Sequence, residues 1–173
     1  MTEPKPPLLV VFYANPDRFP PTYSAVTLLR ERFRVRLVCR ANDEAPSVTW
    51  PEGVRIDRVG PRVSDEQKRA GSAAAKLREY AAFVAAVRRS LRAERPRLVY
   101  AYEPHALVAV AGCAAPVVYH RHDMEDLGAV DRRSLQGWVM IAARRLGKSA
   151  ALLVMPERHR AVSYQAFVGD PRP

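Results

Sequence analysis

Five short apolar runs are the feature of this sequence that most restricts how the chain can fold. Each run is bounded by turn-forming or charged residues and is too short for a helix, which is typical of strands buried on both faces of a sheet. Longer stretches with apolar residues at helical spacing separate most of them. Strands that alternate with helices predict a parallel sheet with right-handed crossovers. The runs are Leu8–Tyr13, Val35–Cys39, Leu98–Tyr102, Pro116–Tyr119 and Ala151–Met155.

The remaining segments complete the expected order of elements. Val54–Val59 alternates apolar and charged residues, which predicts a half-exposed strand near an edge of the sheet. We expect no regular structure in 15–21, which holds three prolines, or in 61–72, which holds almost no apolar residue. The sequence therefore predicts one domain, residues 1–173, of the α/β class: a Rossmann-like, three-layered fold with an open, mainly parallel sheet and helices on both faces. The expected helices are 22–32, 73–94, 105–113, 134–146 and 158–168.

The chain carries a formal net charge of +10, which raises the question of a nucleic-acid partner. Its arginine pairs lie on predicted helices or at their starts, mixed with acidic residues, and there is no dense basic tail, so we expect no nucleic acid. A basic surface also suits phosphorylated substrates or a peripheral contact with anionic lipid. Cys39 and Cys113 lie far apart and predict reduced thiols, hence a cytoplasmic protein, including the inner membrane face.

Several enzyme classes are disfavoured by motifs that the sequence lacks. The first predicted strand leads into Ala14–Asp17 rather than into Gly-x-Gly-x-x-Gly, whose glycines let the backbone approach a dinucleotide pyrophosphate. The sequence has no Gly-x-x-x-x-Gly-Lys-Ser/Thr phosphate loop and no Gly-x-Ser-x-Gly nucleophile elbow. A nicotinamide-dependent enzyme, a P-loop nucleotidase and an α/β-hydrolase are each disfavoured.

The run Pro116–Tyr119 ends on titratable residues, His120, His122 and Asp123. Open α/β sheets bind ligands at the carboxyl ends of their strands, so a buried strand that stops at such residues indicates a site. His120 and His122 are two apart on a strand and should share one face of the sheet. A substrate-binding or catalytic role, a polar structural role and a metal site all remain open for them.

Three other predicted strand ends carry polar side chains that should reach the same edge. Glu103 could face the crevice or cap the following helix, and Glu157 could receive a hydroxyl or hold Arg160 at helical spacing. Arg18 could bind a phosphate or carboxylate, or be an ordinary solvated arginine. The candidate substrate-binding residues at these ends are Asn15, Arg18, Glu103, His105, Glu157 and Arg160.

The ordered set of strand ends resembles the N-terminal domain of GT-B glycosyltransferases, and it is most similar to the retaining enzymes of glycosyltransferase family 4. The motifs are "LLVVFYAN", "RPRLVYAYEPHALVAVA", "PVVYHRHDME" and "AARRLGKSAALLVMPERHRA", which together cover nearly the whole chain in order. The chain departs from the family after the first strand, where prolines replace the usual glycine-rich loop.

The resemblance implies one half of an enzyme that transfers a sugar from a nucleotide-sugar donor to a hydroxyl acceptor. It assigns catalytic positions to His122 and Asp123, and it gives the acceptor, a sugar, lipid or glycan, to this half. The donor binds a C-terminal domain in the family, and this sequence stops at Pro173, so we expect that domain to be missing or supplied by a partner subunit. We expect no cofactor or metal in this chain, and no transferase activity from it alone.

Two functions of other classes remain open at this stage. A non-catalytic α/β module that binds a partner or an anionic ligand would need the same fold and the same basic charge. A metal-dependent hydrolase would use His120, His122 and Asp123 as ligands.

Overall fold

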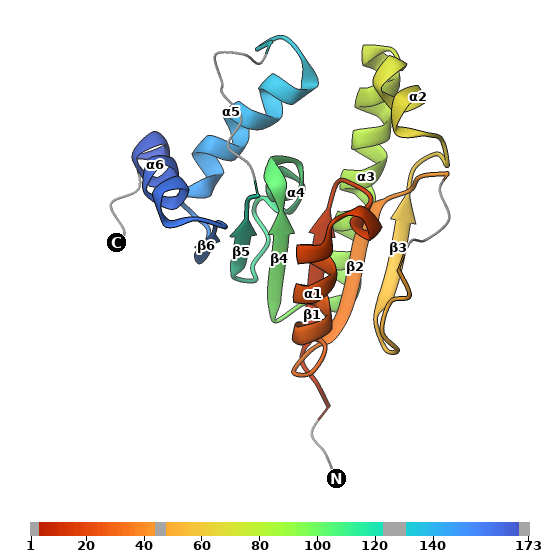
Figure 1. Cartoon of the computed structure of the whole chain (residues 1–173), viewed down its shortest axis with the longest axis vertical. Helices are drawn as coiled ribbons and strands as arrows, with labels where there is room; N and C mark the ends of the chain where they lie inside the picture. The colour runs from red at the N-terminus through yellow and green to blue at the C-terminus, as the bar shows by residue number, and fades with distance from the viewer. Residues whose placement is uncertain (1–3, 44–47, 123–130, 170–173) are drawn as a thin grey trace.

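The computed structural model of the chain describes residues 4–43, 48–122 and 131–169. Six described strands form one sheet in the order β3-β2-β1-β4-β5-β6, and each neighbouring pair is parallel (Figure 1). The predicted α/β class is confirmed. The strands are β1 (Pro7–Phe12), β2 (Arg34–Arg40), β3 (Arg55–Val59), β4 (Leu98–Tyr102), β5 (Val117–His120) and β6 (Leu152–Val154). The helices are the 3-10 helix η1 (Pro16–Arg18), α1 (Pro20–Leu29), α2 (Asp65–Ala70), α3 (Ala73–Glu94), α4 (Glu103–Val110), α5 (Leu135–Gly147) and α6 (Arg158–Val168).

Helices cover both faces of the sheet, as predicted, but unequally. Val11 of β1 is buried with Phe83 of α3 on one face, where α4 and α5 also pack. Val10 of β1 is buried on the other face, and of the described helices only α1 supplies a buried residue there, Val26. Alternate residues of β1 are therefore buried on opposite faces, as expected for a central strand of a parallel sheet.

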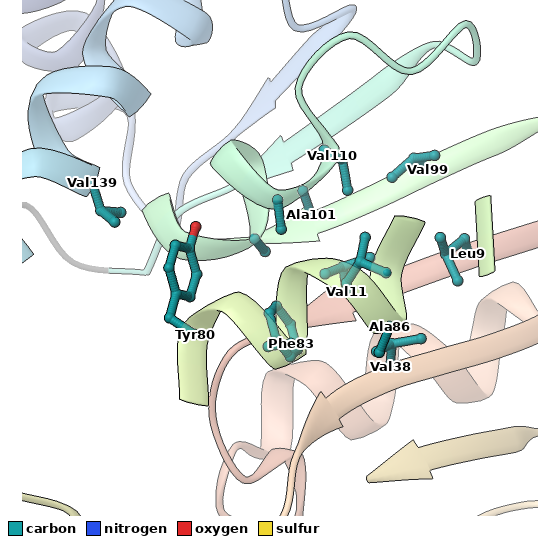
Figure 2. Packing of buried hydrophobic residues seen from close by; sticks show 13 residues of the cluster. Leu9, Val11, Val38, Tyr80, Phe83, Ala86, Val99, Ala101, Val110 and Val139 are labelled. Atoms are coloured by element: carbon teal, nitrogen blue, oxygen red, sulfur yellow. The ribbon is translucent and has the colours of Figure 1, made fainter. Parts of the chain in front are cut away.

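The helix α3 packs across the middle of the sheet and contacts both the central strands and the helices beside it. Phe83 and Ala86 of α3 lie among Val11 of β1 and Val38 of β2 (Figure 2). Because α3 runs back across the sheet after β3, its first turns lie at the carboxyl edge, and there the helix supplies Lys76 to a cavity described below.

The segment 15–21, expected to lack regular structure, instead contains η1 and the start of α1. Pro16 opens η1, and Pro20 and Pro21 occupy the first turn of α1. The first turn of a helix leaves its N–H groups unpaired, so the missing N–H of proline costs nothing there, and its fixed φ suits a helix start. The prediction was wrong because these prolines begin helices rather than interrupt them.

The segment 61–72 was also expected to lack structure, and it contains α2. Ser64 Oγ accepts a hydrogen bond from the Gln67 N–H at 3.1 Å, and Gln67 Oε1 accepts one from the Ser64 N–H at 3.0 Å. This reciprocal cap pairs two donors that a helix start otherwise leaves unpaired. Lys68 Nζ then donates to the carbonyl of Ala41, just beyond β2. Capping and one buried lysine, rather than an apolar face, hold this short helix.

The helix after β4 starts earlier than predicted. It was expected over 105–113, but α4 begins at Glu103 and ends at Val110. Pro104 stands in its first turn, where proline is tolerated. This shift places Glu103 directly at the junction between β4 and α4.

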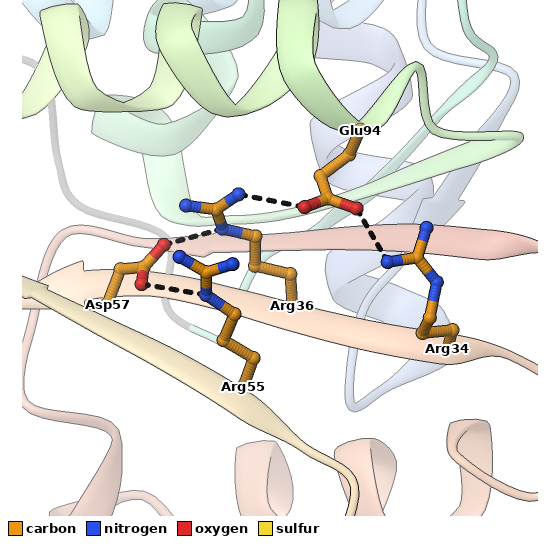
Figure 3. A network of polar contacts seen from close by, with 5 residues as sticks. All are labelled: Arg34, Arg36, Arg55, Asp57 and Glu94. Carbon is orange, nitrogen blue, oxygen red and sulfur yellow. Dashed lines mark hydrogen bonds and ion pairs between the residues drawn. The ribbon is translucent and has the colours of Figure 1, made fainter.

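A polar network joins β2 and β3 to the last turn of α3 (Figure 3). Arg36 Nε lies 2.5 Å from Asp57 Oδ2, and Arg36 Nη1 lies 2.8 Å from Glu94 Oε1. The Arg36 side chain is only 16% exposed, whereas Arg55, whose Nε lies 3.4 Å from Asp57 Oδ1, is 66% exposed. The two arginines thus contact the same carboxylate from environments of different dielectric.

We expect replacement of Arg36 by Gln to lower the free energy of unfolding by about 2 kcal/mol, because two partly buried carboxylates lose their shared cation. Replacement of Arg55 by Gln should cost less than about 0.5 kcal/mol, since water screens that pair. Urea denaturation of both variants measures the difference. Equal costs would contradict this account of the network.

Candidate functional site

The parallel strands end at one edge of the sheet (Figure 1). The described residues that were predicted for a site there fall into two groups, apart from His120, which lies behind the second group. The first group lines a hollow beyond the ends of β1 and β2, which we call the basic cavity. The second surrounds the residue that follows β5, and we call it the His122 cluster: His122, Glu103, Arg160 and Glu157. Phe19 lies between the groups, because it lines the cavity and its ring centroid is 6.1 Å from that of His122.

The basic cavity has a volume of about 470 Å³ and is built from five separate segments of the chain. These segments are the loop after β1, the end of β2, α2 with the start of α3, the first turn of α4, and the first turn of α5. Its lining residues include Tyr13, Asn15, Arg18, Arg40, Lys68, Arg69, Lys76, His105 and Gln136.

The lining of the basic cavity is strongly cationic. It contributes five arginine and lysine side chains, and no acidic residue is among the described residues that line it. Glu79 offsets one of these charges, because its two carboxylate oxygens lie 2.5 and 3.2 Å from Nε and Nη2 of Arg40. Lys76 Nζ donates to the carbonyl of Arg69 at 2.7 Å, which fixes its position in the wall. The cavity is therefore suited to an anionic group.

Tyr13 and His105 form an uncharged wall of the basic cavity. Their rings stack with centroids 5.0 Å apart, and Tyr80 packs edge-on against both. Burial lowers the pKa of His105 to about 4, and the nearby positive charge of Arg40 adds to this. Burial, with the charge of Glu79, raises the pKa of Tyr13 to about 12. Both rings are therefore neutral near pH 7, and the guanidinium carbon of Arg40 lies over the Tyr13 ring, 5.1 Å from its centroid.

The loop that presents Arg18 and Phe19 is fixed by a buried ion pair. Asp17, whose side chain is 2% exposed, has both carboxylate oxygens 2.9 Å from Nη2 of Arg58 on β3. Asn15 Oδ1 accepts the N–H of Asp17 at 3.2 Å and so caps η1. Asn15 thus lines the cavity while its side-chain oxygen holds the loop.

Glu103 binds His122 twice. Glu103 Oε1 accepts the backbone N–H of His122 at 2.8 Å and lies 3.0 Å from His122 Nδ1. Glu103 makes no capping bond to α4, whose N-cap residue is Tyr102, so the capping alternative for Glu103 does not hold. Because an ionised carboxylate can only accept hydrogen bonds, Nδ1 carries the hydrogen of this contact.

Glu103 reaches His122 from a strained backbone conformation. Its φ is +66°, in the left-handed region, and among the described non-glycine residues only Arg95 shares a positive φ. This region costs an ordinary L-residue about 1–2 kcal/mol. The contact with His122 is thus maintained against a local conformational cost, which is typical of residues whose placement matters to a site.

The His122 ring lies in a stack of aromatic rings on the α1 face of the sheet. It is nearly parallel to the Tyr102 ring, with centroids 5.5 Å apart, and its centroid lies 4.4 Å from that of His120. The predicted shared face of the two histidines is confirmed. His122 Nε2 is buried and has no hydrogen-bond partner among the described residues.

His120 is held as a neutral ring behind His122. Its Nδ1 lies 2.9 Å from the hydroxyl of Tyr100. Burial lowers the pKa of His120 to about 4, and the neighbouring His122 ring adds to the effect.

The end of β6 completes the His122 cluster through α6. Arg160 Nη1 donates to the carbonyl of His122 at 3.0 Å, and Arg160 Nε lies 3.3 Å from Glu157 Oε2. The expected pairing of Glu157 with Arg160 is present. Glu157 also lies 2.9 Å from His159 Nε2. The backbone of His122 is therefore held from both sides, by Glu103 and by Arg160.

Some predicted features lie beyond what the structure describes, and some lining residues were not predicted. Asp123 lies outside the described residues. Within the described part, no group of three or more His, Cys, Asp or Glu side chains is placed to hold a metal ion.

Two lining residues that were not predicted, Tyr13 and Arg40, lie directly after or at the end of a strand, so the rule that indicated His122 could have found them. Lys68 was missed with the whole of α2.

Comparison with known proteins supports the sequence resemblance. The family described as "Glycosyl transferase 4-like domain" matches residues 22–173 of the chain. A comparison with curated proteins found no match.

In the described residues no helix combines the length and apolar character needed to cross a membrane. The peripheral membrane contact stays a prediction.

Solved glycosyltransferase structures share the fold. Sucrose-phosphate synthase from Thermosynechococcus elongatus matches with a TM-score of 0.66 and 10% identity, over 94% of this chain and 45% of that one. Phytolacca americana UGT2 matches with a TM-score of 0.58 and 11% identity, over 89% and 48%. A UDP-glucosyltransferase from Polygonum tinctorium matches with a TM-score of 0.56 and 10% identity, over 90% and 47%. The chain thus spans about half the length of these structures.

We expect Glu103→Gly to be more stable than Glu103→Ala by about 1 kcal/mol, because both variants lose the carboxylate but glycine adopts φ near +66° without strain. Urea denaturation of the two variants measures this difference. Glu79, inside α3, gives the matched control. There Glu79→Ala should be more stable than Glu79→Gly, as in any helix interior. An advantage of Ala at Glu103 would contradict the strained placement.

We expect the ring protons of His105 and His120 to titrate near pH 4 in NMR spectra, below the ordinary value of about 6.5. Between pH 6.5 and 4 the unfolded chain then binds protons that the folded chain does not. The free energy of unfolding should therefore fall as the pH is lowered through this window. The variant His120→Asn should lose less stability than the unchanged protein between pH 6.5 and 4. Titration midpoints near pH 6.5 for these two histidines in the folded protein would refute the lowered pKa values.

Proposed function

Because the chain belongs to the glycosyl transferase 4-like domain family, we propose that it is the acceptor-side half of a sugar-transferring enzyme. Its fold is that of the N-terminal half of the GT-B architecture, as in sucrose-phosphate synthase. The proposed donor is a nucleotide sugar held by a second domain or subunit that faces the carboxyl edge. The proposed reaction retains the anomeric configuration, and it needs no metal from the residues of this chain.

The basic cavity is the observation that carries the proposal. It lies at the carboxyl edge of the sheet, where open α/β folds bind ligands, and it is preformed from five segments of the chain. Its cationic lining favours an acceptor that carries a phosphate or carboxylate group. The stacked rings of Tyr13 and His105 give the cavity an uncharged aromatic wall, which suits the C–H groups of a sugar.

The His122 cluster supplies the positioning step in this proposal. In sugar transfer the bond from the anomeric carbon to the leaving diphosphate breaks, and a bond to the acceptor oxygen forms as that hydroxyl loses its proton. Alignment of the reacting groups lowers the barrier because their freedom is lost on binding rather than in the transition state. His122, whose backbone is fixed by Glu103 and by Arg160, is the residue of this cluster that we assign to positioning the acceptor beside the cavity. The charge on the leaving diphosphate would be stabilised by the donor-binding half.

The competing function is a module that binds an anion without taking part in sugar transfer. The cationic lining of the basic cavity fits this function equally well. The two functions differ in one respect. An acceptor site must recognise the sugar as well as the charged group attached to it, whereas an anion-binding module needs only the charge.

Binding of glucose 6-phosphate and of inorganic phosphate to the ¹⁵N-labelled chain distinguishes the two functions. We expect the sugar phosphate to bind more tightly than phosphate, with shifts that extend from the basic cavity to the His122 amide. The double variant Arg18→Gln/Lys76→Gln should weaken both ligands at least about tenfold, through the loss of charge-assisted hydrogen bonds. The variant His122→Asn should reduce only the advantage of the sugar phosphate.

The double variant Arg32→Gln/Arg89→Gln removes the same charge outside the basic cavity and serves as the control. Equal affinity for the two ligands would favour the anion-binding module over the acceptor site. Transfer of sugar from UDP-glucose by the purified chain alone would contradict the assignment of the donor to a second domain.

A further inference from the structure

A second hollow lies at the opposite edge of the sheet, where the strands begin. It is formed by the end of α3, the turn into β4, and the turn that precedes β5, and its volume is about 820 Å³. This volume falls in the range of sites for small organic ligands. We call it the arginine groove, and its lining residues are Arg88, Leu91, Arg92, Arg95, Pro96, Arg97 and Gly112–Pro116.

Four arginines surround the arginine groove, and no acidic residue is among its lining. Arg88 Nη2 donates to the carbonyl of Ala111 at 2.6 Å, so this guanidinium is fixed in the wall. Within the described part of the chain, the side chains of Arg92, Arg95 and Arg97 make no hydrogen bond or ion pair. Like charges gathered without a counter-charge repel one another, and a bound anion would relieve this repulsion.

The backbone that carries these arginines is rigidly held. The N–H of Arg95 donates to the carbonyl of Leu91 at 3.1 Å, and the N–H of Arg97 donates to the carbonyl of Pro7 at 2.8 Å. Arg95 ends α3 with a φ of +44°, a left-handed position that glycine usually occupies at the end of a helix. A cation therefore lines the groove at a position where glycine would be less strained.

Apolar atoms form the rest of the groove. Leu91, Pro96, Ala115 and Pro116 line it together with Cys113. Burial raises the pKa of the Cys113 thiol, so it is neutral and acts as part of the apolar wall. A ligand that fits this lining has phosphate groups for the guanidinium planes and a less polar part against the apolar wall.

We propose that the arginine groove binds a phosphate-bearing organic ligand, separately from the basic cavity. The phosphate is either that of a soluble molecule or that of a lipid headgroup. Arginine is suited to this role because its planar fork forms two parallel hydrogen bonds to phosphate oxygens.

Pyrophosphate titrated into the ¹⁵N-labelled chain tests the phosphate chemistry. We expect saturable shifts of the Gly112, Cys113 and Ala115 amides, which report on the groove and not on the basic cavity. The double variant Arg92→Gln/Arg97→Gln should weaken these shifts at least about tenfold, because two charge-assisted contacts are lost. The double variant Arg32→Gln/Arg89→Gln removes equal charge elsewhere and should leave the affinity within about twofold.

The variant Arg95→Gly separates binding from folding. Glycine relieves the left-handed strain, so the thermal unfolding midpoint should rise while pyrophosphate affinity falls. A variant that is more stable and binds less tightly cannot owe its weaker binding to misfolding. Unchanged affinity in this variant and in Arg92→Gln/Arg97→Gln would overturn the proposal.

Vesicles then identify the source of the phosphate. If sedimentation with phosphatidylglycerol vesicles, compared with phosphatidylcholine vesicles, is lost in Arg92→Gln/Arg97→Gln, the ligand is a lipid headgroup. If pyrophosphate binds the groove but vesicle binding is absent or unaffected by these variants, the ligand is a soluble phosphate. The absence of groove-localised shifts with pyrophosphate and of variant-sensitive vesicle binding would refute both sources.

Discussion

The parallel pairing of β1 with β2 on one side and with β4 on the other fixes where all the functional groups of this protein lie. Because every described strand runs in the same direction, each strand contributes its last residues to one edge and its first residues to the other. The segment that follows each strand therefore lies at the carboxyl edge, and the segment that precedes it lies at the amino edge. Residues far apart in the sequence, such as Arg18, Arg40 and His105, meet in one cavity for this reason.

Carboxylates hold two parts of the carboxyl edge in place. Glu103 occupies a left-handed conformation and holds His122, and Asp17 is buried against Arg58 to hold the loop of Arg18. In both cases a carboxylate fixes a neighbouring residue at the carboxyl edge. Such a site is organised before any ligand arrives, which reduces the freedom that binding must remove.

The sequence carried enough information to place the strands, because short apolar runs and period-two alternation are local signals. The shared face of His120 and His122 followed from the same periodicity. The basic cavity could not be foreseen in full, because its walls combine segments whose relation is tertiary. Lys68 is the clearest case: α2 is held by a cap and by a lysine that reaches Ala41, and neither produces an apolar pattern.

Acidic side chains neutralise several of the arginines that lie beside the strands. Asp57 and Glu94 hold arginines of the sheet, and Glu79 holds Arg40, so these carboxylates offset charges beside the strands. The basic cavity and the arginine groove lack acidic lining residues among those described. A five-residue strand such as β4 spans about 17 Å, roughly twice the Debye length of about 8 Å at physiological ionic strength. The solvent-exposed charges of the two edges are therefore largely screened from each other, so the two proposed anion sites should bind independently.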